Sequence, residues 1–146
     1  MIEGKLFISE YADAIKSIVD VEIRKDEIAF TIIGHSMGGY IALAFAEKYP
    51  ELLNGIGLFH STSFADDDQK KEMRNKGIEF IKKNGPEIFL KNTTPNLFSE
   101  KIKRENPGLL ERLSGLSKSF TPDALIQYYE AMRDRPDRSS ILKDFA

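Results

Sequence analysis

Residues 28–41 read IAFTIIGHSMGGYI, and this stretch decides the fold. The run at 28–33 is apolar at nearly every position and rich in β-branched side chains. Such a run is typical of a strand that is buried on both faces in a parallel sheet. The glycine-rich residues 34–39 follow it directly. The stretch therefore predicts a buried strand that leads into a tight turn.

The neighbouring residues predict the rest of a strand–helix–strand unit. Residues 40–49 are rich in Ala and predict a helix, which ends at Pro50 because proline cannot continue it. A second apolar run at residues 55–59 predicts another strand. Two strands joined by a helix within about 30 residues predict parallel strands and a right-handed crossover. Before this unit, apolar residues at helical spacing between 7 and 21 predict an amphipathic helix.

The turn has the Gly-x-Ser-x-Gly pattern, which places a serine between a buried strand and a helix. Such a turn is sharp and strained, so we expect positive φ at Ser36 and a hydroxyl that projects above the sheet. Side chains at Gly34 and Gly38 are expected to collide with the turn, and Gly39 is expected to let the helix approach the strands closely. The N–H of Met37, at the helix N-terminus, would supply half of an oxyanion hole. The alternative is a glycine-rich turn that binds a phosphate or no ligand.

From residue 62 to the end, the patterns predict helices and no strand. Acidic residues precede the first of these helices, and Gly85-Pro86 marks its end. Thr121-Pro122 is an N-cap followed by proline at the first helical position. The helices are predicted at residues 66–83, 99–104, 107–116 and 121–132, with a short last one after Ser139-Ser140.

Composition limits the class of protein. A chain of 146 residues with 41% hydrophobic and 30% charged residues suits one globular domain. A net charge of −2 gives no basic footprint for nucleic acid, so a small-molecule partner is expected. The absence of cysteine excludes disulfides, thiolate zinc sites and a cysteine nucleophile. No run approaches the roughly 20 apolar residues of a membrane span. We expect a cytoplasmic location. We also expect no metal or organic cofactor.

Residues 5–61 resemble the centre of an α/β-hydrolase-fold serine hydrolase of the esterase, lipase and peptidase type. The resemblance rests on residues 32–46, on Tyr49-Pro50 and on the strand at 56–59. It implies an α/β fold, a partial α/β-hydrolase core with its nucleophile elbow at residues 1–61. Residues 62–146 then resemble the helical cap that often follows in this family, leading to a C-terminal core outside the chain. The resemblance also implies that Ser36 attacks an ester, thioester or amide and forms an acyl-enzyme.

The catalytic partners of the serine do not match the family's pattern. The family's triad runs in the order Ser, Asp or Glu, His. The chain has two histidines: His35, expected to point away from the serine, and His60, expected to line the pocket or pack under the cap. Asp66, Asp67 and Asp68 are interpreted as acids at a helix start, and the alternative is that one of them is the triad acid. Asp134 and Asp137 are interpreted as acids of a solvated loop.

These departures predict a middle fragment that lacks the triad acid, the histidine and the second oxyanion donor. We expect this chain alone to be inactive, with Ser36 as nucleophile only in the parent protein. A sheet of two strands would also leave edge hydrogen-bonding groups and apolar sheet surface exposed, so self-association of the fragment is expected. The rival hypothesis is a non-catalytic protein that binds a small ligand in a hydrolase-like pocket, with the serine serving only as a hydrogen-bonding group.

Overall fold

The computed structural model describes residues 5–22 and 29–145, and their packing forms two compact units. The first unit contains the described parts of Met1–Lys71 and Ala131–Ala146, and the second is Glu72–Glu130. Each unit has its own cluster of buried apolar side chains. The units are therefore described one after the other.

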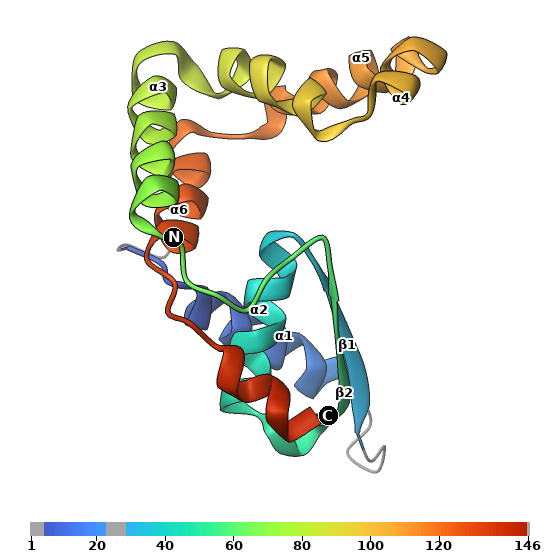
Figure 1. The fold of residues 1–146 in the computed structure, drawn as a ribbon, viewed down its shortest axis with the longest axis vertical. Coiled ribbons are helices and arrows are strands. Elements are labelled where there is room, and N and C mark those ends of the chain that lie inside the picture. The colour runs from blue at the N-terminus through green and yellow to red at the C-terminus, as the bar shows by residue number, and fades with distance from the viewer. Residues whose placement is uncertain (1–4, 23–28, 146) are drawn as a thin grey trace. The chain divides into compact units, whose positions relative to one another are not determined.

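The first unit is built on the predicted strand–helix–strand arrangement (Figure 1). Strands β1 and β2 pair in parallel, and the pairing brings Ile32 beside Ile56 and His35 beside Phe59. The predicted first residue of β1, Ile28, lies outside the described residues, and the strand ends two residues later than expected. The elements are α1 (Ile8–Glu22), β1 (Phe30–His35), α2 (Met37–Lys48), a 3₁₀ turn (Pro50–Leu52) and β2 (Leu53–Phe59).

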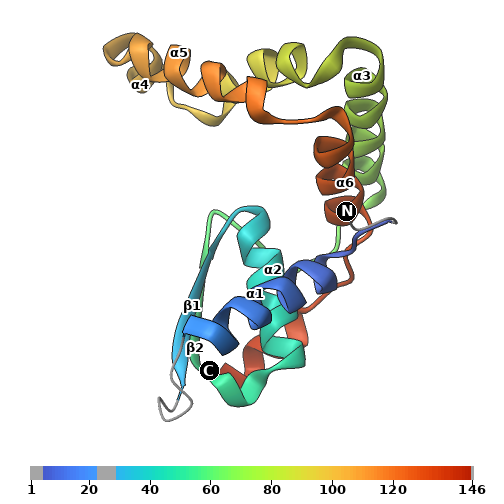
Figure 2. The same ribbon diagram turned by 180° about the vertical axis from the view of Figure 1, so that it is seen from behind.

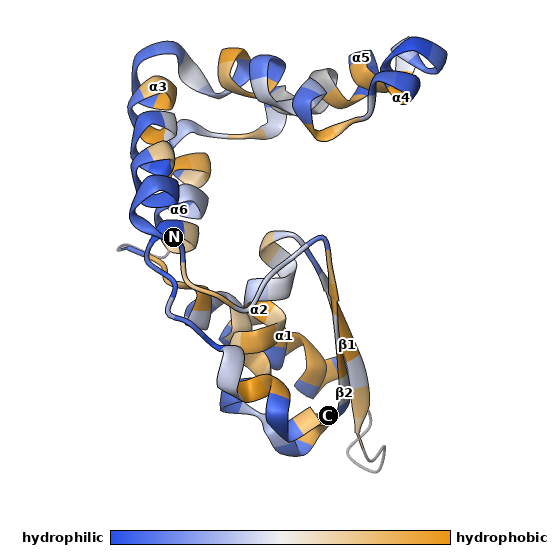
Figure 3. Cartoon of the chain, in the orientation of Figure 1, coloured by the Kyte–Doolittle hydropathy of each residue, from blue (hydrophilic) through white to orange (hydrophobic). Residues whose placement is uncertain are grey.

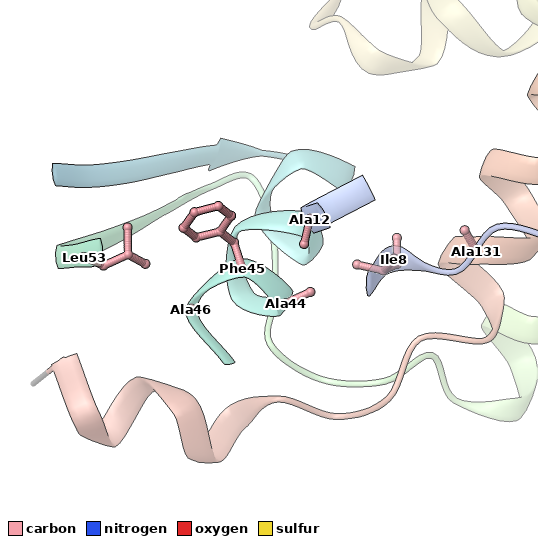
Figure 4. Packing of buried hydrophobic residues seen from close by; sticks show 7 residues of the cluster. All are labelled: Ile8, Ala12, Ala44, Phe45, Ala46, Leu53 and Ala131. Carbon is pink, nitrogen blue, oxygen red and sulfur yellow. The ribbon is translucent and has the colours of Figure 1, made fainter. Parts of the chain in front are cut away.

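One face of this sheet is covered by helices. Figures 1 and 2 show α1 and α2 on the same side of the strands. Helix α2 buries an almost continuous apolar run, Ala42–Ala46, because it packs against both α1 and the sheet. Figure 4 shows Phe45 among the core side chains, and its ring centroid lies 5.9 Å from that of Phe30 in β1. Ile8 and Ala12 of α1 complete this core from the other side.

The opposite face of the sheet is open within the described part of the chain. Thr31, Ile33 and His35 alternate with covered residues along β1, and all three are exposed. Ile33 is 72% exposed and Phe59, at the end of β2, is 58% exposed. Figure 3 shows the hydrophobic character along β1. The exposure of apolar sheet surface that the sequence predicts is confirmed.

Residues 62–145 contain helices and no strand, as predicted for the described residues of this region. The core of the second unit consists of Ile81, Phe89 and Leu125. No helix in residues 5–22 and 29–145 is long and apolar enough to cross a membrane. The elements are α3 (Asp68–Thr93), α4 (Glu100–Glu105), α5 (Pro107–Leu116) and α6 (Pro122–Arg133), with 3₁₀ turns at Thr94–Leu97, Ser117–Ser119 and Ser139–Phe145.

Helix α3 is longer than the sequence predicts, and it is broken where the sequence predicts its end. Gly85 has φ of 81° and ψ of 166°, which are not helical, and Pro86 follows it. The pair ends one helical segment as expected. A second segment then continues to Thr93, and its Phe89 enters the core of the second unit.

The segments at 63–66 and 135–138 are bonded to each other within the first unit. Arg135 pairs with Asp66, with 2.8 Å between Nη2 and Oδ1, and the N–H of Arg138 donates to the carbonyl of Ser63 at 2.8 Å. These bonds explain why residues 62–71 and 131–145 pack with the first unit instead of joining Glu72–Glu130. A functional division into core and cap at residue 61 stays a prediction.

Candidate active site at the strand–helix turn

Ser36 occupies the tip of the turn between β1 and α2. The strand ends at His35 and the helix begins at Met37. Ser36 has φ of 51° and ψ of −120°, so the predicted positive φ is confirmed. A residue with a side chain rarely adopts these angles, and such a conformation costs on the order of 1–3 kcal/mol. The surrounding structure must therefore hold the turn in place.

Hydrogen bonds hold Ser36 from both sides of the turn. Its N–H donates to the carbonyl of Phe59 in β2 at 3.0 Å, which extends the pairing of the strands. Its carbonyl accepts from the N–H of Gly39 at 3.0 Å and from the hydroxyl of Ser61 at 2.8 Å. The backbone of the serine is thus fixed by the helix, by the neighbouring strand and by the segment after that strand.

The glycines of the turn have different steric roles. A Cβ on Gly34 would lie 2.2 Å from the carbonyl oxygen of Gly38, so no side chain fits at position 34. A Cβ on Gly39 would lie 2.2 Å from the hydroxyl of Ser61, and glycine is required there as well. A Cβ on Gly38 would meet no described atom within 4 Å. The expected collision at Gly38 is therefore wrong, because this position faces open space.

The hydroxyl of Ser36 and the N–H of Met37 both lie at the N-terminus of α2. Ser36 stands at the N-cap of α2, yet its side chain makes no capping hydrogen bond, and the residue is exposed. The hydroxyl is therefore not engaged by the helix that follows it. Met37 is the first residue of α2, where an N–H has no acceptor within the helix and the helix dipole favours negative charge. The turn therefore places the Ser36 hydroxyl beside the N-terminus of α2.

The histidines lie near this turn, but their side chains make no hydrogen bond to Ser36. The rings of His35 and His60 are 6.1 Å apart between centroids, at 84°, and each ring contacts Phe59. Both histidines are exposed. No hydrogen bond joins either of these described side chains to Ser36. His60, with φ of 47°, directly follows β2, and its role in a pocket stays a prediction.

The acids that precede α3 divide into a buried one and exposed ones. Asp66 is 4% exposed and pairs with Arg135, so its interpretation as a helix-start acid is wrong: it lies before the helix and within an ion pair. Asp67 accepts a hydrogen bond from the N–H of Lys70 at 2.8 Å, as expected of an N-cap residue. Asp68 is the first residue of α3. Two of the three acids thus have the expected place.

Asp134 and Asp137 are exposed, as predicted, and both are engaged by neighbours. Hydrogen bonds from Arg133 hold the pKa of Asp134 well below its usual range, and Lys5 adds to the effect, while partial burial opposes it. Hydrogen bonds from Ser139 lower the pKa of Asp137. Within residues 5–22 and 29–145, no three His, Asp or Glu side chains gather closely enough to hold a metal ion.

Sequence reasoning placed Ser61, within residues 60–62, as possible lining of an acyl pocket, and it did not predict the bond of Ser61 to the elbow. Ser61 follows the end of β2 by two positions, and its hydroxyl reaches the elbow. The available signal was topological: parallel strands end at the same edge of a sheet, so polar residues after β2 approach those after β1.

A cavity of about 160 Å³ also exists in the first unit, lined by Ile8, Ala131 and Arg138 among others, but Ser36 is not part of its lining.

The chain is similar to a known protein family and to solved structures. A family model described as "Putative esterase" matches residues 6–111 of the chain. A thermophilic esterase from Thermogutta terrifontis, determined with malate bound, is 27% identical, with a TM-score of 0.86. The similarity covers 100% of this chain and 53% of that protein. No curated protein matches the chain in a sequence comparison.

Less similar structures agree on the fold. An α/β hydrolase from a Medee basin deep-sea metagenome library is 19% identical, with a TM-score of 0.79, over 99% of this chain and 52% of that protein. A carboxylesterase of the thaumarchaeon Nitrososphaera gargenis is 15% identical, with a TM-score of 0.76, over 99% and 51%. The chain therefore has a partial α/β-hydrolase fold, and it spans about half the length of these proteins.

Proposed function

Because the chain belongs to the Esterase family, we propose that the protein carrying it hydrolyses carboxylic esters through an acyl-enzyme on Ser36. The observation that carries this proposal is the backbone of Ser36, with φ of 51° and ψ of −120° between β1 and α2. A strained serine at a strand-to-helix turn is the geometry that presents a nucleophile above a sheet. The same chemistry cleaves thioesters and amides. We propose esters because the matching family model is described as "Putative esterase".

The proposed reaction uses the groups that the turn presents. A base takes the proton of the Ser36 hydroxyl while the oxygen attacks the ester carbonyl carbon. The carbonyl oxygen gains negative charge and is stabilised by the N–H of Met37. Collapse of this intermediate breaks the bond to the alkoxy oxygen, which leaves as the alcohol after receiving the Ser36 proton from the protonated base. Water then attacks the acyl-enzyme by the same route and releases the acid.

We further propose that the base, its acidic partner and the second oxyanion donor come from polypeptide outside residues 1–146. Two observations support this. Neither the His35 side chain nor the His60 side chain makes a hydrogen bond to Ser36. The similar structures are about twice the length of the chain. A hydroxyl without a base is a weak nucleophile, so residues 1–146 by themselves are expected to be inactive.

The test compares two polypeptides with p-nitrophenyl acetate as substrate. One is the 146-residue chain, and the other also carries whatever residues flank it in nature. We expect the short chain to release p-nitrophenol no faster than its Ser36→Ala variant. We expect the longer polypeptide to turn over, and Ser36→Ala to lower its kcat by at least about 10⁴-fold.

Two results would count against the proposal. Turnover by the short chain that Ser36→Ala abolishes would mean that residues 1–146 contain the base, and His60→Ala would then be the next variant. A longer polypeptide whose hydrolysis survives Ser36→Ala would favour a protein that binds small ligands without using this serine for catalysis.

A further inference from the structure

Ser61 reaches the elbow from the segment that follows β2. Its hydroxyl donates to the carbonyl oxygen of Ser36 at 2.8 Å. The contact is possible because position 39 carries no side chain: a Cβ on Gly39 would lie 2.2 Å from the Ser61 hydroxyl and 2.5 Å from its Cβ. Residue 61 is partly buried. A serine side chain is therefore seated directly against the backbone of the turn.

The bond acts on the same peptide unit that carries the proposed oxyanion donor. The carbonyl of Ser36 and the N–H of Met37 belong to one peptide group, and none of the described peptide bonds is cis. In a planar trans peptide, the C=O and N–H bonds point in opposite directions. Holding the carbonyl on Ser61 thus fixes the direction in which the N–H of Met37 points.

This restraint matters because the peptide sits at an unusual torsion angle. The ψ of Ser36, −120°, sets the plane of the peptide, and the residue lies in a sparsely populated region. The N–H of Gly39 also reaches the carbonyl, at 3.0 Å, but it comes from the following helical turn. The Ser61 hydroxyl is the restraint that comes from the strand side. The two donors together hold the carbonyl in one direction.

We infer that Ser61 is a positioning residue that aligns the N–H of Met37 with the developing oxyanion, an inference that rests on the proposed hydrolysis by Ser36. Ser61 bonds to the backbone carbonyl of Ser36, so it would act through the peptide and not on the reacting hydroxyl. An oxyanion donor stabilises the transition state only when it is held close to ideal distance and direction. Losing the restraint should weaken transition-state stabilisation and leave substrate binding nearly unchanged.

The kinetic test uses Ser61→Ala in the longer, active polypeptide with p-nitrophenyl acetate. We expect kcat to fall about tenfold, less than the roughly 10²–10³-fold loss of a whole donor, and KM to change by less than about twofold. Ser63→Ala, which removes a hydroxyl from the same segment, is the matched control and should keep kcat within about twofold. A Ser61→Ala enzyme with wild-type kcat, or an equal loss in Ser63→Ala, would overturn the inference.

A spectroscopic test uses the 146-residue chain and needs no activity. In Ser61→Ala, the carbonyl ¹³C resonance of Ser36 and the amide resonances of Met37 should shift by NMR, whereas Ser63→Ala should leave them in place. Unchanged resonances in Ser61→Ala would overturn the inference. The proposed function fails on a different result, hydrolysis that survives Ser36→Ala, so the two failures are distinguishable.

Discussion

Gly34 and Gly38 stand two residues on either side of Ser36, but the turn constrains only the first of them. A Cβ at position 34 would lie 2.2 Å from the backbone oxygen of Gly38, which cannot move without breaking the turn. We expect Gly34→Ala to lower the free energy of unfolding by about 3 kcal/mol. Gly38→Ala enters open space inside a helix and should leave stability unchanged or raise it by up to about 1 kcal/mol. Urea unfolding of both variants measures this, and equal losses would contradict the geometry.

Asp134 provides a prediction of pH dependence. Arg133 donates to both of its carboxylate oxygens, at 2.7 and 2.9 Å, and Lys5 lies 2.5 Å from one of them. The pKa of Asp134 is therefore lower in the folded chain than in the unfolded chain. A lowered pKa contributes stability that is fully present above the unfolded-state pKa of about 3.9. This contribution is lost progressively as the pH falls from that value through the folded-state pKa. Asp134→Asn should destabilise the chain at pH 7 and have a smaller effect at pH 3, by urea unfolding. A penalty that is equal at both values would contradict this.

At the residue scale, the sequence could predict whatever depends on a motif. The positive φ of Ser36 follows from Gly-x-Ser-x-Gly between a strand and a helix, because the pattern requires that turn. The hydrogen bond from Ser61 and the space beside Gly38 could not be predicted. Both depend on where neighbouring segments come to lie, which local sequence does not encode.

The two segments at 63–66 and 135–138 are the elements whose pairing is most sensitive to substitution. The side chains of Asp66 and Arg135 are 1% and 3% exposed, and Arg135 also lies 3.9 Å above the ring of Tyr40. Removing one member of a buried ion pair leaves a buried charge without its partner. We expect Asp66→Ala to lower the free energy of unfolding by about 3–5 kcal/mol.

Glu47→Ala is the matched control for this prediction. Glu47 bonds Arg138 at 2.8 Å, but its own side chain is 45% exposed, so water can replace part of the interaction. Because the partner Arg138 is itself buried, with its side chain 7% exposed, we expect a loss larger than for an exposed pair but smaller than for Asp66→Ala, about 1–2 kcal/mol. Urea unfolding of both variants gives the comparison. Equal losses for Asp66→Ala and Glu47→Ala would show that burial does not set the strength of these pairs.

At the element scale, periodicity predicted the described helices and strands other than α3 to within a few residues, because spacing and end signals are local. The burial of Arg135 and Arg138 was not predictable, since their partners Phe64 and Glu47 lie 71 and 91 residues away. A run of charges at 133–138 has the composition of a solvated loop, and its acids are in fact exposed. The helical continuation to Thr93 was hidden by the glycine and proline that precede it.

At the scale of the whole chain, the open sheet face is the feature that predicts solution behaviour. Ile33 and Phe59 are 72% and 58% exposed on β1 and β2, which have no further strand beside them among the described residues. Exposed apolar strands are templates for association. We expect the 146-residue chain to self-associate and Ile33→Lys to raise the dissociation constant at least about tenfold by sedimentation.

Val21→Lys is the control for this effect, because Val21 is 81% exposed and belongs to helix α1, not to a strand. It should leave the association unchanged. A monomeric wild-type chain, or an equal effect of both substitutions, would contradict a role for the open face.

The fold of the whole chain was predictable from residues 5–61, because the turn and its flanking strands occur together in one family. The catalytic partners of Ser36 were not predictable. Neither histidine side chain makes a hydrogen bond to Ser36, and the chain spans about half the length of the similar structures. A catalytic serine is defined by groups that converge on it from different strands. The described residues contain the strained turn of Ser36, and no histidine side chain among them makes a hydrogen bond to this serine.

The most direct test of Ser36 as the nucleophile is covalent labelling. A fluorophosphonate probe is incubated with the longer polypeptide, and the modified residue is located by mass spectrometry of its peptides. Only an activated serine reacts rapidly with such a probe, because the reaction mimics acylation. We predict one adduct, on Ser36, that disappears in Ser36→Ala. An adduct on another residue, or no adduct from a polypeptide that hydrolyses p-nitrophenyl acetate, would contradict the assignment.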